Sequence, residues 1–183
     1  MSNPKNKKPS NTGKHTSDEP IRVQVVIETP RGSRNKLKFD VASQHFKLSK
    51  VLPEGMVFPY DFGFVPSTKA EDGDPLDVLV LTDEPLFPGC LVDCRLIGVI
   101  KAEQEEEGEI TRNDRVIAVA EGSLLYAETR TLQDLSPTIE KQIEDFFTNY
   151  QRARNIRFTV LERGESQETR AVLQKTSRKK HAA

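Results

Sequence analysis

Three aspartates lie within six residues of this chain, in the segment Glu71–Asp77. Carboxylates this close repel one another, so their crowding costs free energy unless a cation or a proton offsets the charge. Gly73 permits a tight turn and Pro75 stiffens it. The apolar run Val78–Leu81 that follows is typical of a buried strand. The pattern predicts a rigid acidic loop at the mouth of a strand, where a hard divalent cation would find oxygen ligands.

The residue types alone leave a second interpretation of this segment open. Asp, Gly and Pro are ordinary turn residues, and a solvated turn needs no metal. A calcium-binding EF-hand loop does not fit, because Leu76 stands where an oxygen ligand is needed and Asp77 where the invariant glycine belongs. A strand, rather than a helix, also follows.

The segment Asp72–Val78 resembles the signature of the soluble inorganic pyrophosphatases, a Mg-dependent family built on a small β-barrel. Other segments resemble family segments in the same order, namely Val26–Pro30, Gly32–Lys36, Phe58–Phe64, Phe87–Gly89 and Leu96–Val99. The resemblance covers roughly residues 21–164. It implies an α+β fold, with a five-stranded, mostly antiparallel, OB-like barrel and peripheral helices. It also implies hydrolysis of inorganic pyrophosphate to two phosphates by metal-activated water, with Mg²⁺ as the cofactor and Mn²⁺ or Co²⁺ as substitutes.

This chemistry needs both signs of charge in one place. Pyrophosphate carries several negative charges, which slow the attack of water, and divalent cations neutralise the oxygens and acidify the water. Mg²⁺ prefers carboxylates, waters and phosphate oxygens. Cationic side chains hold the phosphates and offset charge on the leaving group. We therefore expect an acidic cluster paired with lysine and arginine.

The resemblance assigns a role to each candidate residue. Asp72 and Asp77 would ligate the metals, Asp74 would orient the attacking water or take its proton, and Glu28 would hold a further metal through water. Substrate-binding positions fall at Lys36, Lys50, Phe62, Arg115 and Tyr150. Two further metal-binding aspartates of the family have their nearest matches at Asn113 and Glu105, with Asp114 as an alternative if the register shifts.

The chain departs from the family pattern at several of these positions. Lys38 stands where the family usually has a glutamate. Lys50 replaces an arginine, and Arg115 replaces a lysine. Phe58 and Phe62 replace tyrosines, and Gln151 replaces a lysine. Exchange of arginine and lysine keeps the charge but alters the geometry. The intact aspartate loop favours an active but divergent pyrophosphatase. The alternatives are a non-catalytic protein that binds phosphate or metal, and a Mg-dependent phosphohydrolase of an organic diphosphate. A nucleic-acid-binding barrel is a further alternative, disfavoured because the chain lacks a basic stripe with interleaved aromatics.

Short β-rich segments must position these residues. Strands are predicted at 22–27, 36–41, 57–64, 78–81, 91–100 and 116–119. One helix is predicted after Ser136, with Pro137 in its first turn and an apolar stripe formed by Ile139, Ile143, Phe146, Phe147 and Tyr150. A second helix is predicted near Gln167–Lys175, and the acidic run Glu103–Glu109 is predicted to be a loop between strands.

The length and composition of the chain limit the number of domains and the classes of protein to which it could belong. At 183 residues, 36% hydrophobic and 30% charged, with a net charge of -1, the chain has the size of one domain with a core. We expect a polar disordered tail at 1–20, a pyrophosphatase-like domain at 21–176 and a basic disordered tail at 177–183. No apolar run approaches a membrane span, and the two cysteines have neither the number nor the spacing of a zinc site. A cytoplasmic protein that binds neither membrane nor nucleic acid is expected, and the resemblance implies a homo-oligomer, either hexamer or dimer.

Overall fold

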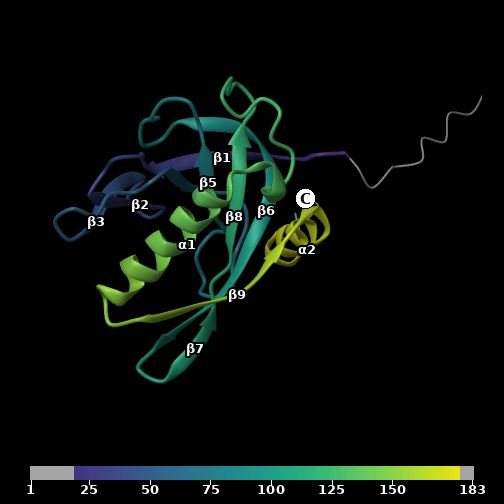
Figure 1. Cartoon of the computed structure of the whole chain (residues 1–183). Helices are drawn as coiled ribbons and strands as arrows, with labels where there is room; N and C mark the ends of the chain where they lie inside the picture. The colour runs from purple at the N-terminus through teal and green to yellow at the C-terminus, as the bar shows by residue number, and fades with distance from the viewer. Residues whose placement is uncertain (1–18, 178–183) are drawn as a thin grey trace, which may run out of the picture.

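A computed structural model describes residues 19–177, so the predicted tails at 1–20 and 177–183 lie almost entirely outside the described residues. The strands are β1 (Ile21–Thr29), β2 (Asn35–Asp40), β3 (His45–Val51), β4 (Asp61–Phe64), β5 (Asp77–Leu81), β6 (Leu91–Glu106), β7 (Glu109–Arg112), β8 (Arg115–Ala120) and β9 (Arg157–Gly164). The α-helices are α1 (Pro137–Arg152) and α2 (Ser166–Thr176), and Leu132–Asp134 forms a 3₁₀ turn. Figure 1 shows the two helices on the outside of the sheet.

Five strands close into a ring in the order β1-β4-β5-β8-β6, and β6 pairs back onto β1. All of these pairings are antiparallel except that between β5 and β8. The five-stranded, mostly antiparallel barrel predicted from the family resemblance is therefore confirmed. β7 and β9 extend the sheet from β6, whereas β2 and β3 form a separate hairpin.

The central strands are buried on both faces, which explains their unbroken apolar sequences. In β5, Leu79 and Leu81 pack in one core cluster with the aromatic side chains of α1, while Val78 and Val80 pack in the other. The helix prediction was correct. The Ser136 hydroxyl accepts a hydrogen bond from the Thr138 amide at 3.3 Å, and the predicted stripe faces the sheet, with only Ile139 partly buried.

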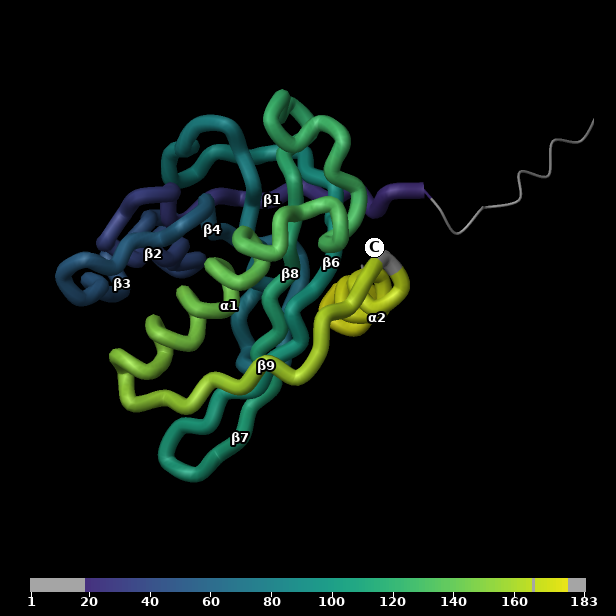
Figure 2. The backbone as a smooth tube through the Cα atoms, viewed as in Figure 1, coloured from purple at the N-terminus to yellow at the C-terminus, as the bar shows by residue number. Residues whose placement is uncertain are grey.

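The prediction for the acidic run was wrong. Residues 103–106 continue β6, and 109–112 form β7, joined by a two-residue turn at Glu107 and Gly108, which both have positive φ. Glutamate has low strand propensity, but here it pairs across the hairpin and against β9, so tertiary pairing overrides the local preference. The long hairpin extends beyond the barrel, and β9 crosses it on the way from α1 to α2 (Figure 2).

Other boundaries also differ from prediction. The strand predicted at 57–64 is regular only from Asp61, because residues 57–60 form a loop in which Phe58 exchanges backbone hydrogen bonds with Gly32 and Ser33. The strands β3, β7 and β9 were not predicted. No residue of β3 or β7 is buried, so neither strand has the apolar alternation that predicts a strand.

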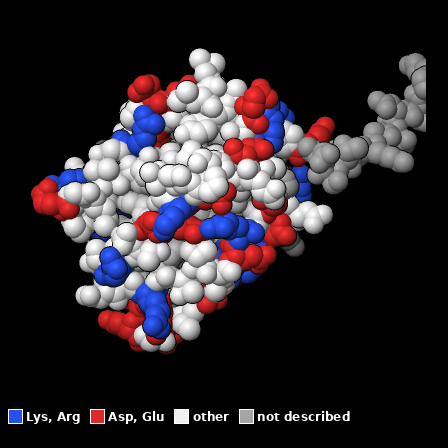
Figure 3. Space-filling view, in the orientation of Figure 1, with Lys and Arg blue, Asp and Glu red and all other residues white. Residues whose placement is uncertain are grey.

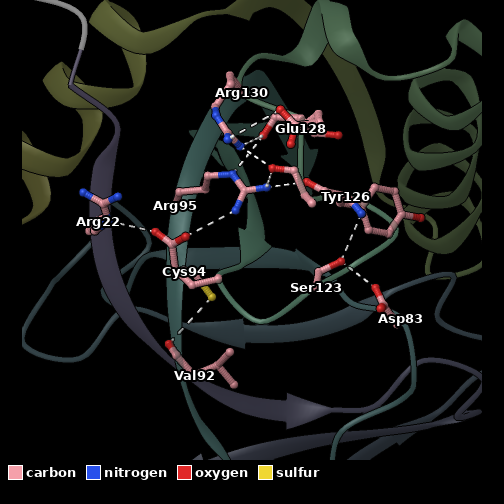
Figure 4. A network of polar contacts seen from close by, with 12 residues as sticks. Arg22, Asp83, Val92, Cys94, Arg95, Ser123, Tyr126, Glu128 and Arg130 are labelled. Atoms are coloured by element: carbon pink, nitrogen blue, oxygen red, sulfur yellow. Dashed lines mark hydrogen bonds and ion pairs between the residues drawn. The ribbon is translucent and has the colours of Figure 1, made fainter.

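A buried arginine ties one long loop to the barrel (Figure 4). Arg95, on β6, donates to the carbonyl oxygens of Thr129 at 2.9 Å and Ala127 at 3.2 Å, and it also contacts the carbonyl of Tyr126. Arg95 pairs with Glu121 at 3.3 Å. These bonds satisfy a charge that would otherwise be costly to bury. Within residues 19–177, neither helix has the length and apolar character needed to cross a membrane.

Gly63, in β4, is expected to tolerate no side chain. A Cβ atom at this position would lie 2.1 Å from the carbonyl oxygen of Val26 in the paired strand β1. Gly63→Ala should reduce the free energy of unfolding by about 3 kcal/mol, because the two strands must move apart. Urea denaturation measures the loss. Gly122→Ala is the matched control, since a Cβ there meets nothing within 4 Å; equal stability of the two variants would contradict this packing.

Candidate active site

The aspartate loop connects β4 to β5 and is held at both ends. The Thr68 hydroxyl accepts a hydrogen bond from the Leu76 amide at 2.8 Å and donates to the carbonyl of Val65 at 2.6 Å. Within the loop, the Ala70 amide donates to the carbonyl of Asp74 at 2.7 Å, and Gly73 adopts a φ of 88°. A residue with a Cβ would strain that conformation.

The end of helix α2 braces the same loop. The Lys69 amide donates to the carbonyl of Thr176 at 2.7 Å, and Lys175 forms an ion pair with Glu71. Thr68 also forms an isolated antiparallel bridge with Ser177. The aspartates are thus fixed to the barrel through β5 on one side and to a helix on the other.

The β2–β3 hairpin brings lysines to the aspartates. Lys36 and Lys38 are two residues apart in β2 and so share a face of the strand. A bulge opposite Lys36 and Leu37 leaves Ser49 as an extra residue of β3, and both Ser49 and Lys50 line the same cavity as the two lysines. A second irregularity, in β1 at Glu28, breaks the alternation of that strand and leaves this glutamate buried.

These elements enclose a cavity of about 230 Å³. The cavity brings together nine of the eleven residues predicted for the site, namely Glu28, Lys36, Lys50, Asp72, Asp74, Asp77, Asn113, Arg115 and Tyr150. It is also lined by Lys38, Ser49, Phe64, Pro75, Gln104, Gln151 and Arg154. Of these, Lys38 was detectable from the sequence, because it lies two residues from Lys36 in a predicted strand.

Two predicted residues do not line this cavity. Phe62 is a core residue whose ring lies beneath the site, 5.2 Å from the Lys36 ammonium and 6.0 Å from the Arg115 guanidinium, and it supports both cations through its π face. Glu105 instead faces Arg157, at 3.5 Å. Its neighbour Gln104 points into the cavity, because successive residues of a strand alternate between faces.

Cations neutralise two of the three aspartates. The Lys38 ammonium lies 2.7 Å from both carboxylate oxygens of Asp74. The Arg115 guanidinium forms an ion pair with Asp77 and is buried. Asp72 accepts a hydrogen bond from the Asp74 amide at 3.1 Å, and burial raises its pKa.

Three amide side chains of the cavity lining are hydrogen-bonded to one another. The Asn113 amide donates to Gln104 at 2.5 Å, and the Gln151 amide donates to the same oxygen at 3.1 Å. Arg154 in turn donates to the side-chain oxygen of Gln151 at 2.7 Å. These bonds join Gln104, Asn113 and Gln151 into a cluster that carries no charge of its own.

Two buried donors at this site lack a partner within the described residues. They are the Tyr150 hydroxyl and the Arg115 Nε–H, on side chains that are about 5% exposed. A buried donor without a partner costs free energy, so such groups are rare in folded proteins unless a ligand satisfies them. Lys36 Nζ lies 5.6 Å from the centre of the Tyr150 ring. Hydroxyl, guanidinium and ammonium donors in one cavity suit an anion with several oxygens.

Burial and neighbouring charges shift the pKa values of three side chains in the site. Burial raises the pKa of Glu28 to about 7, although the Phe39 amide donates to its carboxylate at 2.7 Å. Burial, together with the charges of Arg154 and Lys36, lowers the pKa of Lys50. Partial burial also acts to lower the pKa of Lys38, but the hydrogen bond and charge of Asp74 outweigh it, so that this pKa is raised.

The oxygen ligands that the cavity offers fit a hard cation such as Mg²⁺ better than a softer ion. All are carboxylate or amide oxygens, and they stand beside an anion-binding wall. Within residues 19–177, no group of three or more His, Cys, Asp or Glu side chains is assembled as a cage for a metal. Mg²⁺ does not require such a cage, because it keeps several waters and is bound by one or two carboxylates together with substrate phosphates.

A larger cavity of about 600 Å³ lies beyond the aspartate loop and shares Asp72, Asp77, Asn113 and Arg115 with the first. The three lysines of the candidate site and Tyr150 are not among its lining residues. The larger cavity has cationic side chains of its own, Lys101, Arg112 and Lys175, but each is paired with an acidic side chain. The smaller cavity differs in containing Asp74 and the Tyr150 hydroxyl, which has no partner within the described residues.

Residues 25–181 match the family model described as inorganic pyrophosphatase. The inorganic pyrophosphatase of Nostoc sp. is 40% identical over 132 residues, which are 72% of this chain and 76% of the relative. That of Thermus thermophilus is 40% identical over 131 residues, 72% of this chain and 73% of the relative.

Solved structures give the same result. The crystal structure of the Thermus thermophilus inorganic pyrophosphatase superposes with a TM-score of 0.75 at 32% identity, covering 91% of this chain and 95% of that one. The Helicobacter pylori inorganic pyrophosphatase superposes with a TM-score of 0.78 at 30% identity, covering 89% and 94%.

The raised pKa of Glu28 predicts how the stability of the metal-free protein depends on pH. The folded protein holds a proton on Glu28 up to a pKa of about 7, whereas the ordinary value is 4.5, so folding is progressively disfavoured as the pH rises through this window. Glu28→Gln removes that effect and keeps the oxygen that accepts from Phe39. The variant should be more stable than the unsubstituted protein by roughly 1–3 kcal/mol at pH 8, with the difference vanishing near pH 4.5.

Urea unfolding in the presence of a chelator, at several pH values, measures this difference. The same pH dependence in both proteins would show that burial does not perturb Glu28.

Proposed function

Because this chain belongs to the inorganic pyrophosphatase family and catalyses hydrolysis of inorganic pyrophosphate to two phosphates, we propose that the cavity at the aspartate loop is where it does so, with Mg²⁺ as the cofactor. The observation that supports this most directly is the presence, in one cavity, of the aspartate loop and two buried donors without partners. Those donors are placed for phosphate oxygens, and the carboxylates suit a hard cation.

The side chains divide into three roles in this proposal. Asp72 and Asp77 hold the divalent cations, and Glu28 holds a further one through water. The cations, when bound, neutralise phosphate oxygens and acidify the attacking water. Asp74 orients that water or accepts its proton, which is general-base help worth roughly 10²–10⁴-fold. Asn113 offers only a neutral side-chain oxygen, and Gln104 takes the place in the cavity that was expected for Glu105.

The phosphate side of the site is cationic. Lys36 and Lys50 lie on the hairpin, Arg115 begins β8, and Tyr150 lies near the end of α1. Arg115 pairs with Asp77 in the free protein and has an unpartnered Nε–H, so a phosphate oxygen can draw the guanidinium from the carboxylate. That exchange would release Asp77 for a cation at the moment when substrate binds, which couples the two binding events.

The face shown in Figure 3 gives no support to nucleic-acid binding, since positive and negative side chains are intermixed on it and form no continuous basic stripe. We also infer that copies of the chain associate. Leu124 and Leu125 are 84% and 74% exposed, and their amides donate to the carboxylate of Asp83. Phe87, 66% exposed, follows in the same loop as Asp83. We also propose a cytoplasmic location, with which the free thiols of Cys90 and Cys94 are compatible.

Asp77→Asn tests the metal side of the proposal. The change keeps the shape of the side chain but removes its charge, so kcat/KM for pyrophosphate with Mg²⁺ should fall on the order of a hundredfold or more. A phosphate-release assay measures the loss. Asp145→Asn is the matched control, because Asp145 is an exposed residue of α1 paired with Lys141. A folded Asp77→Asn protein with activity close to that of the control would refute the assignment.

Tyr150→Phe tests the phosphate side. The hydroxyl has no partner within the described residues, so its removal should leave the free energy of unfolding unchanged or slightly higher. If the hydroxyl donates to a phosphate oxygen, KM for pyrophosphate should rise about tenfold, as expected for loss of a hydrogen bond to a charged group. Tyr126→Phe, at a position outside the cavity, is the control. An unchanged KM in Tyr150→Phe would exclude this contact.

A further inference from the structure

Cationic side chains outnumber acidic ones in the lining of the cavity that is proposed to hold divalent cations. Its lining includes five cationic side chains, Lys36, Lys38, Lys50, Arg115 and Arg154. It includes four acidic ones, Glu28, Asp72, Asp74 and Asp77. The carboxylates alone would attract several cations, but fixed positive charge already outnumbers them.

Lys38 is the cation placed most directly on the acidic loop. Its ammonium contacts both oxygens of Asp74 at 2.7 Å, and the charges of Glu28 and Asp77 also act on it. Lys38 and Asp74 are each about half exposed and line the cavity, so the pair lies at the mouth of the site and not in the core. An ammonium in that place supplies one positive charge among three carboxylates.

The amide side chains of the cavity add no negative charge that would attract a further cation. Gln104 and Asn113 are bonded to each other, and Gln151 donates to the same Gln104 oxygen. An amide whose N–H is engaged in this way still has an oxygen, but it carries no charge to hold a divalent ion. Among residues 19–177, the carboxylates that line the cavity are those of Glu28, Asp72, Asp74 and Asp77.

We propose that Lys38 is a built-in cation that takes the place of one divalent cation beside Asp74, so that the free protein binds fewer divalent ions than its acidic loop would otherwise hold. This inference rests on the proposed role of the aspartate loop in holding metal. Lys38 is then a specificity residue for the cation requirement of the reaction, and it offsets charge on Asp74 and the adjoining phosphate without a bound ion.

Mn²⁺ binding in the absence of pyrophosphate tests the proposal, because Mn²⁺ favours the same oxygen ligands as Mg²⁺ and its bound fraction is measurable by electron paramagnetic resonance. Lys38→Glu should bind one more Mn²⁺ per chain than the unsubstituted protein. Lys38→Gln removes the ammonium and adds no carboxylate, so it should also bind one more Mn²⁺ per chain than the unsubstituted protein, although less tightly than Lys38→Glu does.

Lys47→Glu is the matched control. Lys47 is paired with Lys38 across the hairpin, but its ammonium bonds to Asp40 and it does not line the cavity. Its substitution should leave both the number and the affinity of the Mn²⁺ ions unchanged. Thermal unfolding of each variant establishes that it is folded.

The outcomes separate this inference from the function on which it rests. An unchanged number of bound Mn²⁺ in Lys38→Gln would overturn the role of Lys38, whatever number Lys38→Glu binds, because the new glutamate is itself a ligand. Asp77→Asn in the same measurement should lower Mn²⁺ binding. If it does not, the metal-binding role of the loop fails as well. Weaker binding in Asp77→Asn with no effect of Lys38 would refute only the inference about Lys38.

Discussion

Carboxylates held on one short loop repel one another, and this fold offsets that repulsion with cations that come from distant parts of the chain. Lys38 reaches Asp74 from the hairpin, and Arg115 reaches Asp77 from β8. The pair of Arg115 and Asp77 depends on β5 and β8 lying side by side, and the pair of Lys38 and Asp74 depends on the placement of the β2–β3 hairpin beside the loop. The loop is thus stabilised by tertiary structure, and its local sequence would not hold the same conformation unaided.

The same constraint explains the surroundings of the loop. The end of helix α2 bonds to Lys69 and Glu71 of the loop. These bonds restrain the loop, so the three carboxylates do not move apart to relieve their repulsion. Beneath the cavity, aromatic rings support the cations, with Phe147 lying 5.2 Å from the Arg115 guanidinium. A rigid site that holds unpartnered donors costs stability. The strands buried on both faces supply the apolar burial that compensates for this cost.

Much of this arrangement could be predicted from the sequence, for physical reasons that differ between its parts. Val78–Leu81 and the stripe of α1 are apolar because they are buried, so their periodicity reveals them. The number of strands in the barrel came from the family resemblance, since periodicity does not fix which strands pair. β3 and β7 were missed because their stability comes from pairing with neighbouring strands, and that pairing leaves little apolar pattern in the sequence.

A predicted site residue that does not line the cavity, Glu105, is also the most informative about the site. Matching by residue type selected Glu105 as the acidic residue of the β6 wall, but strand alternation turns Gln104 into the cavity and Glu105 toward Arg157. A shift of one residue therefore replaces a carboxylate with an amide and leaves the cavity with an excess of positive charge. A lone divalent cation entering this cavity is opposed by that charge. The same cation bound to pyrophosphate arrives as an anion, which the excess charge attracts. If the proposed site is correct, the electrostatics of the cavity would favour entry of metal and substrate together, and the proposed exchange of Arg115 from Asp77 to a phosphate would follow the same order.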